Sequence, residues 1–197
     1  MNFLAHAYLS FHHPEILVGN MISDFVKGSS KFNYGITIQK GIMLHREIDQ
    51  FTDVHPATHE AMQFFKPYYR LYSSPIMDIL YDHFLANDET IFKDDSSLKI
   101  FTREIYSHLE TYSTQLPEKF VYVFTYMRME DWLYNYRLKQ GIEKSLRGLI
   151  RRAAFISDSD TAINLFLENY DHLDQCYKKF FPDVKQFAKQ KLDELVL

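Results

Sequence analysis

Three short apolar-rich segments of the chain each carry two polar side chains four residues apart, and this feature constrains the fold most. The segments are residues 16–26, 41–51 and 76–85, and the pairs are Asn20/Asp24, His45/Asp49 and Asp78/Asp82. A spacing of four places both side chains on one face of an α-helix. Because the first and third segments are apolar almost all round, we expect buried helices whose carboxylates need an ion-pair partner or a metal ion.

The remaining sequence also favours helices. At 197 residues the chain fits one domain with a substantial core, and only six glycines and six prolines interrupt it. Residues 36–51 are predicted to form a long helix. Residues 120–124 would suit a strand by composition, but no other segment offers a strand partner, so we predict a helix. Pro182 is expected to precede a last amphipathic helix. We predict an all-α fold, with one irregular helical domain over residues 1–197.

Composition excludes several classes of protein. A net charge of −4 argues against general nucleic-acid binding. No apolar run reaches the roughly 18 residues that a membrane span requires. The first residues have neither a basic n-region nor a small-residue cleavage site, so we expect no signal peptide and a cytoplasmic location. Cys176 is the only cysteine, which permits no internal disulfide.

The polar pairs suit divalent metals, but each also has a simpler explanation. Imidazole and carboxylate ligands such as His45/Asp49 suit manganese, iron or zinc, while the alternative is a hydrogen-bonded pair on a half-exposed helix. Two carboxylates on one face, such as Asp78/Asp82, repel each other unless a positive group lies between them. For this pair the alternative to a metal is an ion pair, for which three basic side chains are available: Lys27, Arg46 and Arg70.

The remaining candidates are the pair Asn20/Asp24 and two histidines, His6 and His83. Asn20/Asp24 could instead form a hydrogen bond near a helix C-terminus, although a carboxylate there is disfavoured by the helix dipole. His83 follows Asp82 directly, about 100° round an ideal helix, so it could bind the same metal, donate to a ligand or lie in the core. His6 has apolar neighbours, which is more typical of a core histidine than of a ligand.

A basic stripe lies in the second half of the chain. On an ideal helix its four members fall within about 80° of one face. They are Arg137, Lys144, Arg147 and Arg151. The stripe is either a solvated helix face or a docking surface for an acidic partner.

Five ordered motifs within residues 1–86 resemble the acyl carrier protein phosphodiesterase family. They are Asn-Phe-Leu-Ala-His at residues 2–6, Gly-Asn at 19–20 with Asp-Phe-Val-Lys-Gly at 24–28, Leu-His-Arg at 44–46 with Ile-Asp at 48–49, Phe-Thr-Asp at 51–53 with His-Pro at 55–56, and Asp78 with Asp-His-Phe-Leu at 82–85. The rest of the chain resembles the family only in its helical and aromatic-rich character.

The resemblance implies a divergent, all-α relative of the HD-type metal phosphohydrolases. It implies manganese-dependent hydrolysis of holo-acyl carrier protein to apo-acyl carrier protein and 4′-phosphopantetheine, with magnesium or iron as other possible metals. The metal ligands expected from the motifs and the polar pairs together are His6, Asp24, His45, Asp49, Asp78, Asp82 and His83. The adjacent Asp82-His83 pair reverses the His-Asp order of an HD dyad.

The same resemblance suggests roles in catalysis and binding. Asp24 or Asp49 would ligate the metal or accept a proton from water, while Arg46 and Lys27 would neutralise phosphate charge. The acidic carrier protein would dock on the basic stripe. Two other functions fit the residues: an HD-like metal phosphohydrolase for a nucleotide or another phosphoester, and a non-enzymatic helical binding protein.

Overall fold

Helices make up the architecture of residues 1–196, which are the residues that the computed structural model describes. These residues contain no β-strand, and residues 120–124 lie within a helix, so the predicted all-α fold is confirmed. Leu197, the last residue of the predicted domain, lies outside the described residues. The α-helices are α1 (Phe3–Tyr8), α2 (Pro14–Ile22), α3 (Ile36–Val54), α4 (Pro56–Met62), α5 (Lys66–Tyr69), α6 (Ser73–Ala86), α7 (Asp95–Thr111), α8 (Glu118–Met129), α9 (Trp132–Asn135), α10 (Lys139–Arg152), α11 (Asp160–Glu168) and α12 (Tyr170–Val196). Short 3₁₀ turns are η1 (Ser23–Phe25), η2 (Gly28–Asn33), η3 (Arg70–Tyr72) and η4 (Ser113–Gln115).

Helices α2 and α3 pack so closely that their backbones are in contact. Gly19 and Gly41 meet where the two helices cross, and a Cβ atom added to Gly41 would lie 2.3 Å from the carbonyl oxygen of Ile16. A Cβ added to Gly19 would lie 2.1 Å from the carbonyl oxygen of Ile38. Only glycine permits this backbone contact. It brings the polar residues of α2 beside those of α3.

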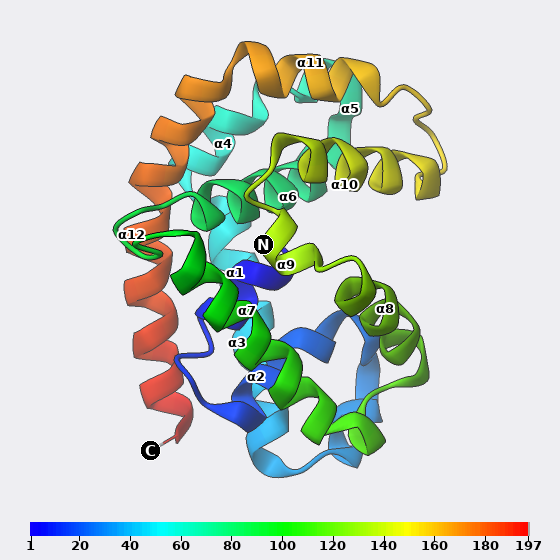
Figure 1. Ribbon diagram of the computed structural model, residues 1–197, viewed down its shortest axis with the longest axis vertical. Coiled ribbons are helices and arrows are strands. Elements are labelled where there is room, and N and C mark those ends of the chain that lie inside the picture. The colour runs from blue at the N-terminus through cyan, green and yellow to red at the C-terminus, as the bar shows by residue number, and fades with distance from the viewer. Residues whose placement is uncertain (197) are drawn as a thin grey trace.

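The longest helix, α12, forms one side of the molecule and packs against α3 and α4 (Figure 1). The N-terminus lies near the middle of the same view, where α1 packs against α2 and α6. Tyr81 of α6 stacks on Phe180 of α12, with ring centroids 4.7 Å apart. Helix α10 covers the other side of α6. The short helix α1 is therefore enclosed by longer helices, which buries the first residues of the chain.

Two expectations about helix boundaries were wrong. Pro182 lies inside α12 rather than before a last helix. It removes one backbone hydrogen bond, which typically costs about 3 kcal/mol, but its neighbours Phe180, Phe181 and Val184 are buried and hold the helix on the core. Arg137 does not share a helix with the rest of the basic stripe, because extended backbone at Leu138 separates α9 from α10.

None of the helices in residues 1–196 is both long enough and apolar enough to cross a lipid bilayer.

Candidate active site

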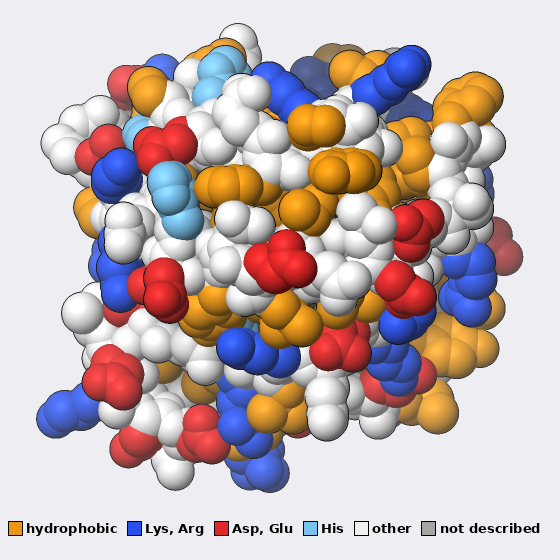
Figure 2. All heavy atoms as spheres, turned by 90° about the horizontal axis from the view of Figure 1, so that it is seen from above, with side chains coloured by type: hydrophobic (Ala, Val, Ile, Leu, Met, Phe, Trp, Pro, Cys, Tyr) orange, Lys and Arg blue, Asp and Glu red, His pale blue; other side chains and the backbone are white. Residues whose placement is uncertain are grey.

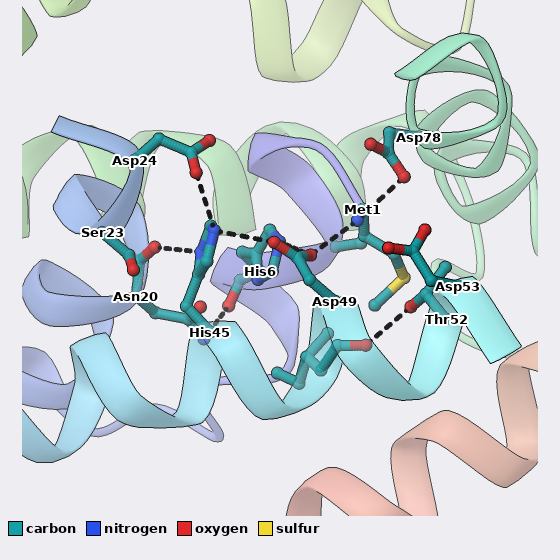
Figure 3. A network of polar contacts seen from close by, with 12 residues as sticks. Met1, His6, Asn20, Ser23, Asp24, His45, Asp49, Thr52, Asp53 and Asp78 are labelled. Carbon is teal, nitrogen blue, oxygen red and sulfur yellow. Dashed lines mark hydrogen bonds and ion pairs between the residues drawn. The ribbon is translucent and has the colours of Figure 1, made fainter. Parts of the chain in front are cut away.

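A cluster of histidine and aspartate side chains forms where α1, η1, α3 and α6 meet (Figure 3). The members from these elements, in chain order, are His6, Asp24, His45, Asp49 and Asp78. All three apolar-rich segments identified in the sequence therefore contribute to the cluster, and α1 adds His6. The structure brings together five of the seven metal ligands expected from the sequence.

Asp49 is the centre of the cluster. Its Oδ1 lies 3.1 Å from Nε2 of His6, and its Oδ2 lies 3.1 Å from Nε2 of His45, one helical turn earlier on α3. Oδ1 of Asp24 lies 3.3 Å from the same Nε2 of His45. The two imidazole rings stack, with centroids 3.8 Å apart. Each oxygen of Asp49 thus faces a different histidine.

The donor atoms of this cluster fit a divalent metal ion. One ligand atom from each of His6, His45 and Asp49 lies within 4.8 Å of the other two. Nε2 of His45 is buried and makes no well-directed hydrogen bond to any described residue, although two carboxylates are near. A metal ion placed between this nitrogen and the carboxylates would satisfy it. Imidazole nitrogen and carboxylate oxygen together suit a divalent transition metal, so the cluster is compatible with one.

The two histidines differ in charge. Burial and the neighbouring His45 lower the pKa of His6 to about 4, so His6 is neutral near pH 7. Burial also lowers the pKa of His45, but Asp24 and Asp49 outweigh it and raise the value to about 9. Burial raises the pKa of Asp49, yet His6, the N-terminal ammonium and His45 together hold it well below the usual range. A metal bound here would displace the proton of His45.

Asp78 is paired with the ammonium group of Met1. The ammonium nitrogen lies 3.0 Å from Oδ1 of Asp78 and 2.9 Å from Oδ1 of Asp49. Burial lowers the pKa of this amine, but Asp78 and Asp49 outweigh it and raise the pKa to about 11. Burial raises the pKa of Asp78. The basic side chains proposed as alternative partners of Asp78 form no ion pair with it in residues 1–196.

Asp82 is fully buried and caps α1. Its carboxylate accepts hydrogen bonds from the backbone nitrogens of Leu4, at 2.8 Å, and Ala5, at 3.0 Å. Burial raises the pKa of Asp82 to about 7, although these two hydrogen bonds oppose the shift. The residue lies one turn beyond Asp78 on α6, and it holds the helix that carries His6.

Asn20 supports both histidines. Its side-chain nitrogen donates to the carbonyl oxygen of His6 at 2.9 Å. Its own carbonyl oxygen accepts from Nδ1 of His45 at 2.7 Å, which fixes the ring so that Nε2 points toward Asp49. Asn20 is on α2, whereas Asp24 lies beyond the helix end in η1. Asp24 is 73% exposed, so the predicted burial of this carboxylate was wrong.

The structure does not bring His83 into the cluster. Its Nδ1 lies 2.7 Å from the carbonyl oxygen of Tyr136, and its Nε2 lies 2.9 Å from the hydroxyl of Tyr170. Burial lowers the pKa of His83 to about 4. The sequence left three roles for His83, namely metal ligand, donor to a ligand and core residue. The structure favours the core residue.

Arg46 and Lys27 are exposed and lie close to cluster residues in the chain, Arg46 directly after His45 and Lys27 three residues after Asp24. Nη2 of Arg46 donates to the carbonyl oxygen of Val26 at 3.1 Å, directly before Lys27 in the chain. Both side chains are exposed, and neither forms an ion pair with a cluster carboxylate within the described part of the chain. Their positive charges are therefore available to an anion that approaches the edge of the cluster.

Sequence reasoning missed the structural roles of Asn20 and Asp82 and the contact of Met1. One feature of the sequence could have suggested the role of Asp82. A short apolar helix at the start of the chain needs partners for its first backbone amides, and a buried carboxylate is a suitable partner. The sequence did not show which carboxylate would supply them.

Fold and site together define an all-helical protein with a histidine–aspartate cluster that is compatible with a divalent metal. The sequence profile of the family described as acyl carrier protein phosphodiesterase matches residues 1–184. Over 191 residues the chain is 30% identical to the acyl carrier protein phosphodiesterase of Photorhabdus laumondii, which covers 97% of this chain and 96% of that protein. It is 31% identical to the protein of the same name from Salmonella agona, and that alignment covers 97% of this chain and 99% of the Salmonella protein. No solved structure matches the chain.

The chain belongs to the acyl carrier protein phosphodiesterase family. The resemblance seen in the sequence motifs is thereby confirmed, and the enzyme class of the family is that of the phosphodiester hydrolases.

Proposed function

We propose that this protein hydrolyses holo-acyl carrier protein to apo-acyl carrier protein and 4′-phosphopantetheine with a divalent metal held by His6, His45 and Asp49. The observation that carries the proposal is the convergence of these three side chains, with donor atoms within 4.8 Å, in a member of this family. Manganese is the metal we favour, because the carboxylates of Asp24 and Asp78 lie beside these three ligands and make the cluster rich in oxygen. Magnesium and iron are the other choices. The cytoplasm is the compartment we propose.

The side chains divide the chemistry among them. A divalent ion, when bound, supplies a Lewis acid for the phosphoryl oxygens and lowers the pKa of water. Asp49 holds both histidines in position through its two oxygens. Asp24 is exposed and lies beside His45, where it can accept a proton from water that attacks the phosphodiester. Arg46 and Lys27 neutralise phosphate charge at the edge of the site.

The kinship to HD-type phosphohydrolases belongs to the proposal as well. It is consistent with an all-α fold and with a site that combines histidine and aspartate. Here the ligands come from α1 and α3. The adjacent Asp82 and His83 instead support α1 and the interior around Tyr136.

Metal dependence tests the proposal. We expect chelator-treated protein to leave holo-acyl carrier protein intact and manganese to restore its conversion to the apo form, measured by intact mass. The same preparation should act far more slowly on a small phosphodiester such as bis(4-nitrophenyl) phosphate. Full activity after complete metal removal would contradict the metal site. Efficient cleavage of the small ester without cleavage of the carrier protein would contradict the substrate.

The basic stripe on α10 is our proposed docking surface for the carrier protein. Arg147 and Arg151 line an open hollow of about 600 Å³ beside Phe155, which is 90% exposed. Arg147 also pairs with Asp160 at 2.8 Å, and Lys144 pairs with Glu130 at 2.6 Å. Arg137, before the helix, pairs with Asp95. Helix α10 packs on α6, the helix that carries Asp78.

Basic, acidic and apolar side chains are mixed over the face seen in Figure 2. Within the stripe, the ion pairs with Asp95, Glu130 and Asp160 neutralise part of the positive charge. We propose that its contribution to docking is concentrated at Arg147 and Arg151, next to the exposed Phe155.

Charge reversal tests this surface. We expect the double variant Arg147→Glu/Arg151→Glu to raise KM for the carrier protein about tenfold while kcat changes little, because the lost contacts act on association rather than on the reacting bond. Lys178→Glu/Lys189→Glu, which reverses two exposed lysines of α12, is the matched control and should leave KM unchanged. Equal KM values for both double variants and the natural protein would remove α10 from docking.

A further inference from the structure

A second group of metal-ligating side chains lies outside the candidate active site, between α4 and α12. It comprises Glu60 of α4 with His172 and Cys176 of α12, and one ligand atom from each lies within 4.8 Å of the other two. His172 and Cys176 are four residues apart, so both occupy the face of α12 that packs on α4. Histidine and acidic side chains gather at the left of Figure 2, the side on which α4 and α12 lie in Figure 1.

The geometry of Glu60 leaves one oxygen directed at this group. Oε1 lies 2.7 Å from Nε2 of His172, while Oε2 lies 3.4 Å from Nζ of Lys179. A cation beside Oε1 would replace the direct contact between Oε1 and Nε2 of His172, but it need not break the ion pair with Lys179. Phe64 contacts the ring of His172 edge-on, with centroids 5.1 Å apart, and limits its rotation. The three donors are thus held on two packed helices.

The chemical types of the three donor atoms indicate which metal ion the group would bind. Thiolate sulfur, imidazole nitrogen and carboxylate oxygen suit zinc, whose bonds to sulfur and nitrogen are about 2.3 and 2.0 Å long. A tetrahedral ion places its ligand atoms about 3 to 4 Å apart, so small side-chain rotations close the group around it. Manganese and magnesium prefer oxygen-rich sites. The proposed active site lacks sulfur, so the two clusters differ in the metals that they favour.

We propose that Glu60, His172 and Cys176 form a zinc site that ties α4 to α12, with water completing the coordination on the exposed side. Cys176 is buried while Glu60 and His172 are exposed, so the open position faces solvent. Burial and the charge of Glu60 raise the pKa of the Cys176 thiol to about 11. Zinc binding therefore releases the thiol proton to solvent and weakens as the pH falls.

Cobalt(II) provides a specific probe, because Cys176 is the only cysteine in the chain. A thiolate-to-cobalt charge-transfer band in the near ultraviolet can arise only there, whatever binds at the histidine–aspartate cluster. We expect chelator-treated, reduced protein to develop this band, to saturate by about two equivalents of cobalt because the histidine–aspartate cluster also takes up metal, and to lose the band when excess zinc is added.

Variants separate this site from binding by a lone thiol. Cys176→Ser should abolish the band, and the exposed substitutions His172→Gln and Glu60→Gln should each weaken cobalt binding at least about tenfold while circular dichroism is unchanged. His59→Gln, also on α4, is the matched control and should keep the band. Absence of the band in the natural protein would overturn the proposal. So would a band that His172→Gln and Glu60→Gln leave unaffected.

Discussion

Replacing Asp49 with asparagine is expected to lower kcat for holo-acyl carrier protein by about 10³-fold or more, the scale of losing a central group in a catalytic unit. Asp49 places one oxygen 3.1 Å from each histidine of the cluster, and Oδ1 also contacts the ammonium group of Met1. Asparagine keeps the shape but removes the charge and one acceptor oxygen. Both the metal and the orientation of the histidines then lose their main support.

Asp53→Asn is the matched control for this variant. Asp53 lies one helical turn further along α3, is exposed, and accepts a hydrogen bond from Ser74 at 2.7 Å. Its substitution should leave kcat within about twofold, because Asp53 is exposed and contacts neither His6 nor His45 in the described residues. Initial rates and metal content of both variants provide the comparison. An Asp49→Asn variant with natural activity and natural metal content would remove Asp49 from the site.

Gly41→Ala is expected to lower the free energy of unfolding by about 3 kcal/mol or more, and it will prevent folding if the natural protein is only marginally stable. The added Cβ would lie 2.3 Å from the carbonyl oxygen of Ile16 and 2.9 Å from Cα of Gly19. Both are backbone atoms, so neither can turn aside as a flexible side chain could. The helices α2 and α3 would separate, and Asn20 would lose its contact with His45.

Gly148→Ala provides a control with the opposite expected sign. It lies inside α10, where the added Cβ would meet only the side chain of Arg152 at 3.6 Å. Alanine is favoured over glycine in a helix interior by about 1 kcal/mol, so this variant should be slightly more stable. Urea unfolding curves measure both effects. Equal stability of Gly41→Ala and the natural protein would show that α2 and α3 do not pack as described.

The helical fold and the centre of the cluster could be predicted from sequence because both depend on local periodicity. The spacing of His45 and Asp49 placed them on one face of α3, where Nε2 of His45 lies 3.1 Å from Oδ2 of Asp49. Asp24 could not be placed correctly, because α2 ends at Ile22 and the backbone turns before the aspartate. At that end the hydroxyl of Ser23 donates to the carbonyl oxygen of Ile42 on α3 at 3.3 Å, a contact that the local spacing does not reveal.

The role of Asp82 depended on a long-range contact. Nothing in residues 76–85 indicates that the first backbone amides of α1, nearly eighty residues earlier, lie beside this carboxylate. The same holds for His83, whose partners Tyr136 and Tyr170 are distant in sequence. Pro182 shows the converse: its local preference predicts a helix start, and the buried residues around it override that preference.

The most direct test of the proposed reaction is intact mass spectrometry of holo-acyl carrier protein after incubation with the manganese-loaded enzyme in ¹⁸O-labelled water. If water attacks the phosphorus atom at the His6–His45–Asp49 cluster, the carrier protein loses its phosphopantetheine group, and the label appears in the phosphate of the released 4′-phosphopantetheine. A carrier protein of unchanged mass would contradict the proposed reaction. Label in the carrier protein's serine would contradict attack at phosphorus.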